Sequence, residues 1–336
     1  MQTITVIMKK FYFLFLFFLP GFPGLSQTNF SIEILREEAR QFLDESSPVE
    51  VIGSEFMWTE GPLYIEDEGY LLVSDIPRNS IYKIDRNGRT TLYLKPSGFL
   101  GQNFQGDEPG SNGLLLDDQG RLVMMQHGER RIAYMNAPLD HPSTDFVVLT
   151  DQFDGERFNS PNDGVFDSRG NLYFTDPIYG LPQRANDPAR ELDFCGVFRL
   201  SPSGDVTLLD TLSRPNGIAL SPNEKKLYVA VSDPAHATWY EYDLKRNGKV
   251  GKRKLFYDAT HLVGSPGQQG LPDGMAMHGS GNLFASGPGG LWIFNPSGQP
   301  IARIYTGKAT SNCTFSNDEK TLFVTADDLV LRIGMK

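Results

Sequence analysis

Cysteine is scarce in this sequence, which has only Cys195 and Cys313 among 336 residues. So few thiols exclude a disulfide scaffold and a zinc site built from cysteines. The sequence also lacks a Gly-x-Ser-x-Gly elbow, a Gly-Lys-Ser/Thr phosphate loop and a His-Glu-x-x-His helix. These absences disfavour a serine hydrolase and a zinc protease. The two cysteines are expected either as buried thiols or, if the chain is exported, as one disulfide.

Basic residues are also fewer than acidic ones. The chain has 31 Lys and Arg against 41 Asp and Glu, which gives a formal net charge of −10. Nucleic acids and anionic membrane surfaces bind clusters of basic residues, so neither is expected as the main partner. With 40% hydrophobic and 21% charged residues, the composition is that of a globular chain.

The one pure apolar run of note lies at the N-terminus. Lys9 and Lys10 precede the run from Phe11 to Leu19, and small residues follow up to Ser26. A basic start, a short apolar stretch and a small-residue end are typical of a secretory signal peptide, here residues 1–26. As a helix the run would be about 14 Å long, too short to cross a bilayer. The sequence therefore predicts an exported protein, periplasmic or secreted, whose mature chain has no membrane span.

Glycine and proline are abundant, with 34 and 22 residues, and predict many turns between short elements. A polar residue, usually followed by glycine, opens a half-apolar run, a polar turn and a second apolar run, and this pattern recurs six times at intervals near 50 residues. The opening residues are Glu60, Asn112, Asn162, Asn216, Asp273 and the pair Ser311-Asn312. A third strand follows in every copy and a fourth in five copies. This register predicts an all-β fold, a six-bladed β-propeller with four-stranded antiparallel blades. Two stacked β-sandwiches would explain the strands but not the register.

The ends of the chain complete this architecture. The sixth repeat stops after its third strand, and residues 49–52 are expected to supply the missing outer strand and close the ring. Residues 31–44 carry apolar side chains at helical spacing after Ser31 as N-cap, which predicts a short helix outside the ring. The expected organisation is a signal peptide (1–26), an N-terminal extension with the helix (27–48) and the propeller (49–336).

The register also predicts a functional site. In a propeller the innermost strands line the central channel, so the six opening positions are expected to converge at one mouth of it. A ring of oxygen donors with two carboxylates suits Ca²⁺, or Mg²⁺ and Mn²⁺, and suits Zn²⁺ poorly. Taken alone, each Asn-Gly or Asp-Gly pair is better explained by a turn, and only the shared register favours a metal site. Asp163, beside Asn162, is a further carboxylate that would be either a ligand or a proton acceptor.

Three other residues are candidates for contact with a substrate. His127 follows the second strand of the second repeat and would face the pocket, although a lone histidine is more often a packing residue. Arg157 and Asn159 precede Asn162 on a segment expected to reach the same face. Either would hydrogen-bond substrate hydroxyls, and a solvated loop is the equally weighted alternative.

Four motifs in this order resemble a known family: Glu60-Gly61-Pro62, Ser160-Pro161-Asn162-Asp163, Arg214-Pro215-Asn216-Gly217 and Pro272-Asp273-Gly274. They are similar to the senescence-marker-protein/gluconolactonase family, which includes regucalcin and, more distantly, diisopropylfluorophosphatase. The resemblance is strongest to bacterial gluconolactonases, through the stretches around His127, Phe158–Asp163 and Thr175–Pro177. It extends over roughly residues 50–334.

The resemblance implies one catalytic divalent cation, most often calcium, at the channel mouth. Carried over by position, Glu60, Asn162, Asn216 and Asp273 would hold it, and Asp273 would also be the general base. Regucalcin-like members carry arginine at the position of Ser160, so Arg157 and Asn112 are the expected substitutes for contact with the sugar.

The expected activity is metal-assisted hydrolysis of a sugar lactone to an aldonic acid. A related esterase or organophosphate hydrolase and a non-catalytic propeller stabilised by its metal are the alternatives. The sequence gives no indication of the oligomeric state.

Overall fold

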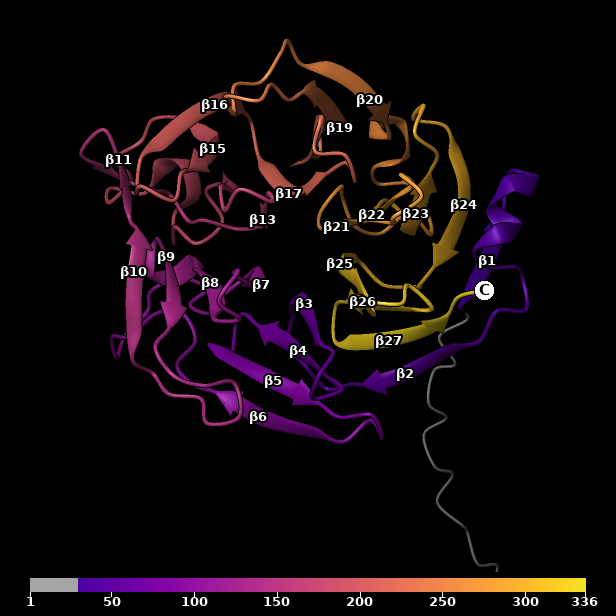
Figure 1. Ribbon diagram of the computed structural model, residues 1–336, viewed down its shortest axis with the longest axis horizontal. Coiled ribbons are helices and arrows are strands. Elements are labelled where there is room, and N and C mark those ends of the chain that lie inside the picture. The colour runs from indigo at the N-terminus through magenta and orange to yellow at the C-terminus, as the bar shows by residue number, and fades with distance from the viewer. Residues whose placement is uncertain (1–29) are drawn as a thin grey trace, which may run out of the picture.

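Each repeat of the sequence folds as one antiparallel sheet, because alternating apolar residues separated by tight turns favour hairpins. The computed structural model describes residues 30–336, which form six such sheets arranged as blades around a common axis (Figure 1). The predicted signal peptide lies outside the described residues. Within residues 30–336 no helix is long and apolar enough to cross a membrane.

The first three blades follow one another along the chain, each running from its innermost to its outermost strand. The first blade comprises β3 (Thr59–Ile65), β4 (Tyr70–Asp75), β5 (Ser80–Ile84) and β6 (Thr90–Leu94). The second comprises β7 (Leu114–Leu116), β8 (Leu122–Gln126), β9 (Arg131–Met135) and β10 (Phe146–Thr150). The third comprises β13 (Gly164–Phe166), β14 (Leu172–Asp176), β15 (Cys195–Leu200) and β16 (Val206–Leu212). Between the second and third blades lies a small hairpin of β11 (Gln152–Phe153) and β12 (Glu156–Arg157).

The other three blades continue the same order, and two of them recruit N-terminal strands. The fourth blade comprises β17 (Pro215–Leu220), β18 (Lys226–Asp233), β19 (His236–Asp243) and β20 (Lys254–Asp258). The fifth comprises β21 (Met275–Met277), β22 (Leu283–Gly287), β23 (Gly290–Phe294), β24 (Pro300–Tyr305) and, outermost, β1 (Ser31–Ile34). The sixth comprises β25 (Thr310–Phe315), β26 (Thr321–Ala326), β27 (Leu329–Gly334) and, outermost, β2 (Val49–Gly53). The predicted six-bladed all-β fold is therefore confirmed.

The ring closes through its N-terminal strand, as the sequence predicts. Strand β2 pairs antiparallel with β27, with Val49 opposite Ile333 and Val51 opposite Leu331 (Figure 1). The first and last strands of the propeller thus share one sheet, and the edge of β27 is covered.

The expected helix over residues 31–44 is wrong in its first half. Residues Ser31–Ile34 form strand β1, which pairs with β24 along the outer edge of the fifth blade. Only η1 (Glu37–Gln41) is helical, as a short 3₁₀ segment. The apolar spacing is compatible with both structures, and the open edge of β24 decides between them because it satisfies the backbone groups of β1. Phe42 and Leu43, which follow η1, are buried against the fifth and sixth blades.

The core lies between neighbouring blades. Met125 of the second blade shares one apolar cluster with Phe174 of the third. Trp239 of the fourth blade lies edge-on to Phe294 of the fifth, with 5.2 Å between ring centroids. Cys195 and Cys313 are buried free thiols, which settles the alternatives left open by the sequence. These contacts between blades hold the inner strands around the axis.

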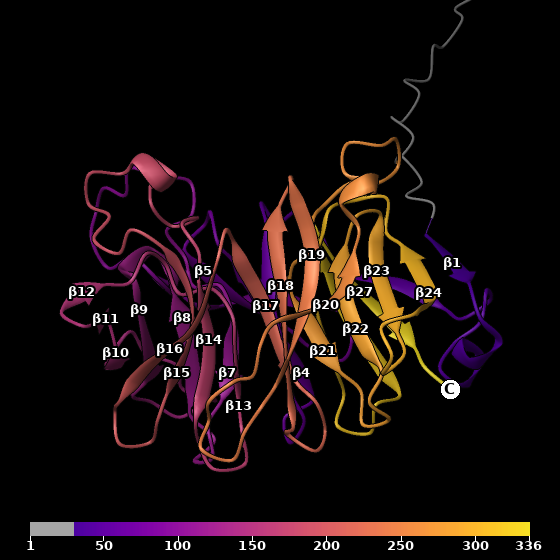
Figure 2. The same ribbon diagram turned by 90° about the horizontal axis from the view of Figure 1, so that it is seen from above.

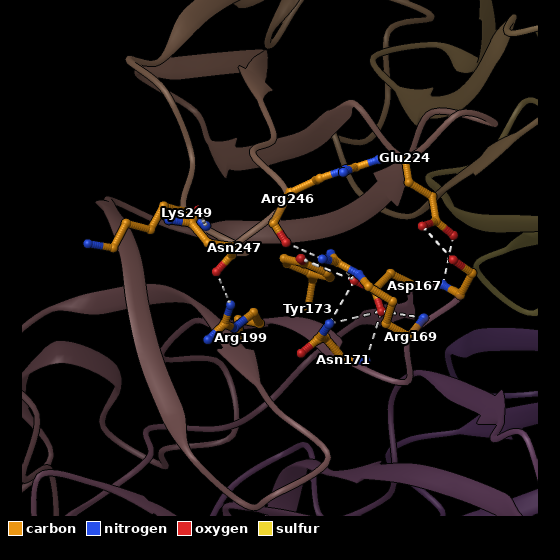
Figure 3. A network of polar contacts seen from close by, with 10 residues as sticks. Asp167, Arg169, Asn171, Tyr173, Arg199, Glu224, Arg246, Asn247 and Lys249 are labelled. Atoms are coloured by element: carbon orange, nitrogen blue, oxygen red, sulfur yellow. Dashed lines mark hydrogen bonds and ion pairs between the residues drawn. The ribbon is translucent and has the colours of Figure 1, made fainter.

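Polar contacts reinforce the same interfaces at the ends of the hairpins. The turn between β13 and β14 carries Asp167, which accepts hydrogen bonds from Arg169 and Asn171 (Figure 3). Arg169 in turn contacts a carbonyl oxygen of the fourth blade. Arg199 donates to Asn247 O at 2.7 Å. The third and fourth blades are thereby fixed at the end of the ring opposite the start of each inner strand.

Candidate active site at the channel mouth

Five of the six opening positions of the repeat meet in one cavity. The cavity has a volume of about 220 Å³ and lies where the inner strands begin. The segments that carry η3 (Arg184–Asn186) and η4 (Thr260–Leu262) rise from this end of the ring (Figure 2). The polar side chains that line it are Glu60, Asn112, Asn162, Asn216 and Asp273, together with Glu108, Tyr179, Ser232 and Thr310. The convergence expected from the register is therefore present.

The glycines of the repeat reflect how closely neighbouring blades approach at the axis. Gly113 N donates to Asn162 O at 2.8 Å, which ties the second blade to the third. A Cβ added at Gly61 would collide with the carbonyl oxygen of Asn112, and one at Gly217 would meet the backbone of the fifth blade. These glycines are therefore required by contact between blades, not by a hairpin turn.

Four of these side chains present a buried oxygen that lacks a hydrogen-bond partner among the described residues. The atoms are Oδ1 of Asn112, Asn162, Asn216 and Asp273. The amide of Asn216 is oriented by its nitrogen, which donates to Ser232 Oγ at 3.2 Å, while Ser232 Oγ donates to Pro272 O at 2.6 Å. Leaving a buried acceptor unpaired costs about 1–3 kcal/mol. Four such oxygens on one cavity therefore indicate a ligand that accepts lone pairs.

The surroundings of the carboxyl groups in the cavity disfavour their ionised form. Burial, together with nearby Asp163, raises the pKa of Glu60 to about 8. Burial and the charge of Glu60 raise the pKa of Asp273 well above its ordinary range. Two ionised carboxylates so placed require a compensating positive charge.

The donor set fits a hard divalent cation. Residues 30–336 contain no cluster of three or more His, Cys, Asp or Glu placed to hold a metal, so amide oxygens would have to complete the coordination. Two carboxylates with three amide oxygens match the preference of calcium or magnesium and lack the nitrogen or sulfur that zinc prefers. Glu60 is held in place by Gly61 N at 3.1 Å and by Asn312 Nδ2 at 3.2 Å.

Asp163 and the sixth opening position lie below this cavity. Asp163 and Asn312 line a second cavity of about 400 Å³ on the other side of the inner ring. Asp163 Oδ1 accepts from Gly164 N at 2.8 Å, and burial raises the pKa of Asp163 to about 7. Ser311 Oγ donates to Thr59 O at 2.6 Å. These residues brace the ring from within, and the expectation that the sixth position joins the mouth does not hold.

His127 does not face the cavity, contrary to expectation. Its ring is fully buried, with Nε2 at 3.0 Å from Glu108 Oε2 and Nδ1 at 3.2 Å from Pro161 O. A carbonyl oxygen only accepts, so Nδ1 carries a proton. His127 therefore reaches the cavity only through Glu108.

Asn159 and Arg157 also lie outside the cavity lining. Asn159 is buried, with Nδ2 at 3.2 Å from Asp176 Oδ2 and Oδ1 at 3.2 Å from Arg190 Nε. Its amide is thus engaged on both sides. Arg157 is exposed on β12 and donates to Glu129 O at 3.0 Å. The expectation that either contacts substrate hydroxyls does not fit this geometry, because both side chains bond to neighbouring protein groups outside the cavity.

The comparisons with known proteins agree with this arrangement. A family model described as the SMP-30/gluconolactonase/LRE-like region matches residues 58–328. The chain belongs to this family. A gluconolactonase of Zymomonas mobilis is 41% identical over 299 residues, which span 88% of this chain and 83% of that protein. A solved gluconolactonase structure from Xanthomonas campestris has a TM-score of 0.77 at 27% identity and covers 91% of this chain and 95% of its own.

A further relative of this chain has another name. Diisopropyl-fluorophosphatase of Loligo vulgaris is 26% identical over 287 residues, 79% of this chain and 84% of that protein. The resemblance derived from the four motifs is therefore confirmed, including its extension to this relative.

In this gluconolactonase-family chain, the sequence failed to indicate several lining residues. Glu108 lies between β6 and β7, outside the repeated pattern. Tyr179 follows β14 in a Tyr-Gly pair whose simplest interpretation is a turn, and Leu271 precedes Asp273 in a glycine-rich segment. None of them occupies a position that recurs from blade to blade, so periodicity carries no signal for them.

Proposed function

We propose that this protein hydrolyses sugar lactones with the help of one divalent cation, Ca²⁺ in the first instance, bound at the channel mouth. The observation that supports the cation most directly is the set of unpartnered buried oxygens on Asn162, Asn216 and Asp273. The substrate class is supported by the relatives named gluconolactonase.

Glu60, Asn162, Asn216 and Asp273 would hold the cation, because their oxygens line the same cavity from four different blades. When bound there, a divalent cation supplies Lewis acidity toward a carbonyl oxygen and lowers the pKa of water. The blade-to-blade contacts keep these side chains in place before the substrate arrives, so little reorganisation is needed during the reaction.

The chain's own residues account for the rest of the chemistry. In this proposal Asp273 accepts a proton from the water whose oxygen attacks the lactone carbonyl carbon. The bond from that carbon to the ring oxygen then breaks, and the proton passes from Asp273 to the departing oxygen, which yields an open hydroxy acid. Asn112, whose Oδ1 is unpartnered, orients the substrate. Asp163 lines the lower cavity, so this proposal gives the proton transfer to Asp273 and not to Asp163.

Part of the cavity wall is apolar. Trp58, Ile76 and Leu271 contribute to it and would exclude water around the reacting ester. This wall also suits a phosphotriester, so hydrolysis of an organophosphate is the second candidate, given the similarity to diisopropyl-fluorophosphatase. Rates measured on one aldonolactone and one organophosphate separate the two.

The test is acid release from D-glucono-1,5-lactone by chelator-treated protein with Ca²⁺, Mg²⁺, Mn²⁺ or Zn²⁺ added back singly. We expect turnover to vanish on chelation and to return best with Ca²⁺. Asp273→Asn should abolish it, whereas Asp118→Asn, at an exposed turn position, should leave it unchanged. Full turnover by chelated protein would refute the role of the cation, and wild-type activity in Asp273→Asn would refute that residue's role.

We also propose that the protein is exported and that its mature chain begins near Gln27. The basic start and short apolar run of residues 1–26 support this. N-terminal sequencing of protein recovered from periplasmic and culture fractions is the test. Recovery of a chain that still begins at Met1, confined to the cell interior, would refute it.

A further inference from the structure

A third carboxylate, Glu108, lines the cavity but does not belong to the ring of repeat positions. It lies on the segment between β6 and β7 and is about three-quarters buried, with 24% of its side chain exposed. Glu60 and Asp273 already place two carboxylates in this space. A third carboxylate here costs free energy unless it has its own compensating charge.

Glu108 has such compensation from outside the ring. Its Oε1 accepts from Arg184 Nη2 at 3.1 Å, and its Oε2 lies 3.0 Å from His127 Nε2. Burial raises the pKa of Glu108, but the hydrogen bonds and charges of His127 and Arg184 outweigh it and lower the pKa overall. Arg184 is therefore a dedicated cationic partner of the Glu108 carboxylate, and His127 contributes a second polar contact.

Arg184 is itself fixed by a second lining residue. Its guanidinium carbon lies 5.5 Å from the ring centroid of Tyr179, and Tyr179 Oη donates to Ser232 O at 2.8 Å. Glu108, between the first and second blades, and Tyr179, in the loop between β14 and β15 of the third blade, thus meet through Arg184 beside the cavity. This arrangement fixes the carboxylate of Glu108 before a substrate binds.

We propose that Glu108 recognises the hydroxyl groups of the substrate and sets the preference for polyhydroxylated lactones. A carboxylate presents about four acceptor positions, of which Arg184 Nη2 occupies one on Oε1 and the contact with His127 Nε2 one on Oε2. The acceptor capacity that remains is available to substrate hydroxyls in the cavity that Glu108 lines. His127 and Arg184 are positioning residues in this scheme. The inference rests on the proposed lactonase function and adds that the site selects its substrate by the hydroxyl groups.

This role predicts rejection of lactones that lack hydroxyls. A site built to hydrogen-bond a hydroxyl discriminates against the analogue without it, because its buried polar group is then left unpaired. A hydrogen bond to a charged group contributes about 10- to 100-fold in binding. Loss of Glu108 should therefore weaken binding of the hydroxylated substrate alone.

The experiment compares D-glucono-1,5-lactone with δ-valerolactone, which has the same ring without hydroxyls. Kinetics are measured for wild type, Glu108→Gln and Glu129→Gln, each checked for an unchanged melting temperature. Glu129 provides the matched control. Its Oε1 accepts a hydrogen bond at 2.7 Å from Leu100 N, which lies in the same β6–β7 segment as Glu108, but Glu129 does not line the cavity.

We expect Glu108→Gln to raise KM for the gluconolactone at least about tenfold, with kcat nearly unchanged and δ-valerolactone hydrolysis within about threefold of wild type. Glu129→Gln should change neither substrate. An equal loss on both lactones, no loss on either, or the same selective loss in Glu129→Gln would overturn the inference while the lactonase function stands. If the wild type hydrolyses neither lactone, the proposed function fails and this inference fails with it.

If Glu108→Gln does not fold, Arg184→Ala provides the second test, because this half-exposed side chain can be removed without opening the core. It leaves Glu108 without its cationic partner and should raise KM for the gluconolactone selectively, by a smaller factor. An unchanged KM in Arg184→Ala would then count against the proposal.

Discussion

The sharpest consequence of the cavity is that Asp273→Asn should have opposite effects on the metal-free and the calcium-loaded protein. In the metal-free protein the substitution removes one of two crowded carboxylates, and with it the repulsion from Glu60 that, beside burial, raises the pKa of Asp273. In the loaded protein it removes a charged ligand. A residue with a purely structural role would destabilise both forms alike.

The expected magnitudes follow from linkage and from the cost of buried charge. Calcium at a hundred times its Kd stabilises the native state by about 2.7 kcal/mol. For a chain of this size that corresponds to a rise in Tm of about 4 °C. A buried carboxyl whose pKa is raised destabilises the native state at neutral pH by about 1.4 kcal/mol per pKa unit, so metal-free Asp273→Asn should melt above metal-free wild type.

The assay is thermal unfolding of wild type, Asp273→Asn and the control Asp118→Asn, each in chelator and in excess Ca²⁺. We expect a calcium-dependent rise in Tm for wild type and the control and little or none for Asp273→Asn. A wild type that melts at the same temperature in both buffers would refute the cation site. An undiminished calcium response in Asp273→Asn would remove this residue from it.

Other predictions concern the scaffold that holds the site. Gly217→Ala should lower the free energy of unfolding by about 2–4 kcal/mol in a denaturant titration, because a Cβ there meets the backbone at Asp273, whereas Gly251→Ala, with only ordinary contacts, should change it little. Asp176→Asn should cost about 2–3 kcal/mol in the same titration, since its oxygens accept from the backbone N–H groups of Asn159 and Ser160; an unchanged midpoint would contradict this. Burial raises the pKa of the Cys195 thiol to about 12, so neither cysteine should react with a thiol reagent until the chain unfolds; rapid labelling of the native protein would show that the thiols are accessible.

The sequence predicted the parts of this molecule that repeat. The inner strands share one register, and any residue at the equivalent point of each blade is brought to the axis by symmetry. This is why Glu60, Asn112, Asn162, Asn216 and Asp273 could be assigned to one cavity without coordinates. The glycine after most of them carried the same information, because only glycine tolerates the close approach of the next blade.

Segments without a repeat were predicted poorly, for identifiable reasons. Residues 31–34 have a spacing that a helix and a strand can both satisfy, and only the open edge of β24 selects the strand. Asn159 and His127 lie near the mouth in sequence order, but their polar atoms are engaged by Asp176 and Glu108. Which partner a polar side chain meets depends on neighbouring loops, and a single sequence does not specify that.

Different parts of the chain build the cation site and the part of the cavity that selects the substrate. The proposed cation ligands lie at or just before the inner strands, where a shift of one blade would disturb its neighbours, so their geometry is tied to the integrity of the fold. Glu108 lies in the segment between β6 and β7 and Tyr179 in the loop between β14 and β15, and the two segments are joined through Arg184. Exchange of those two segments for ones of different sequence should therefore alter which ester is accepted while the calcium-dependent rise in Tm persists. The cation site and the selection of substrate are thus separable in this propeller, because different parts of the chain build them.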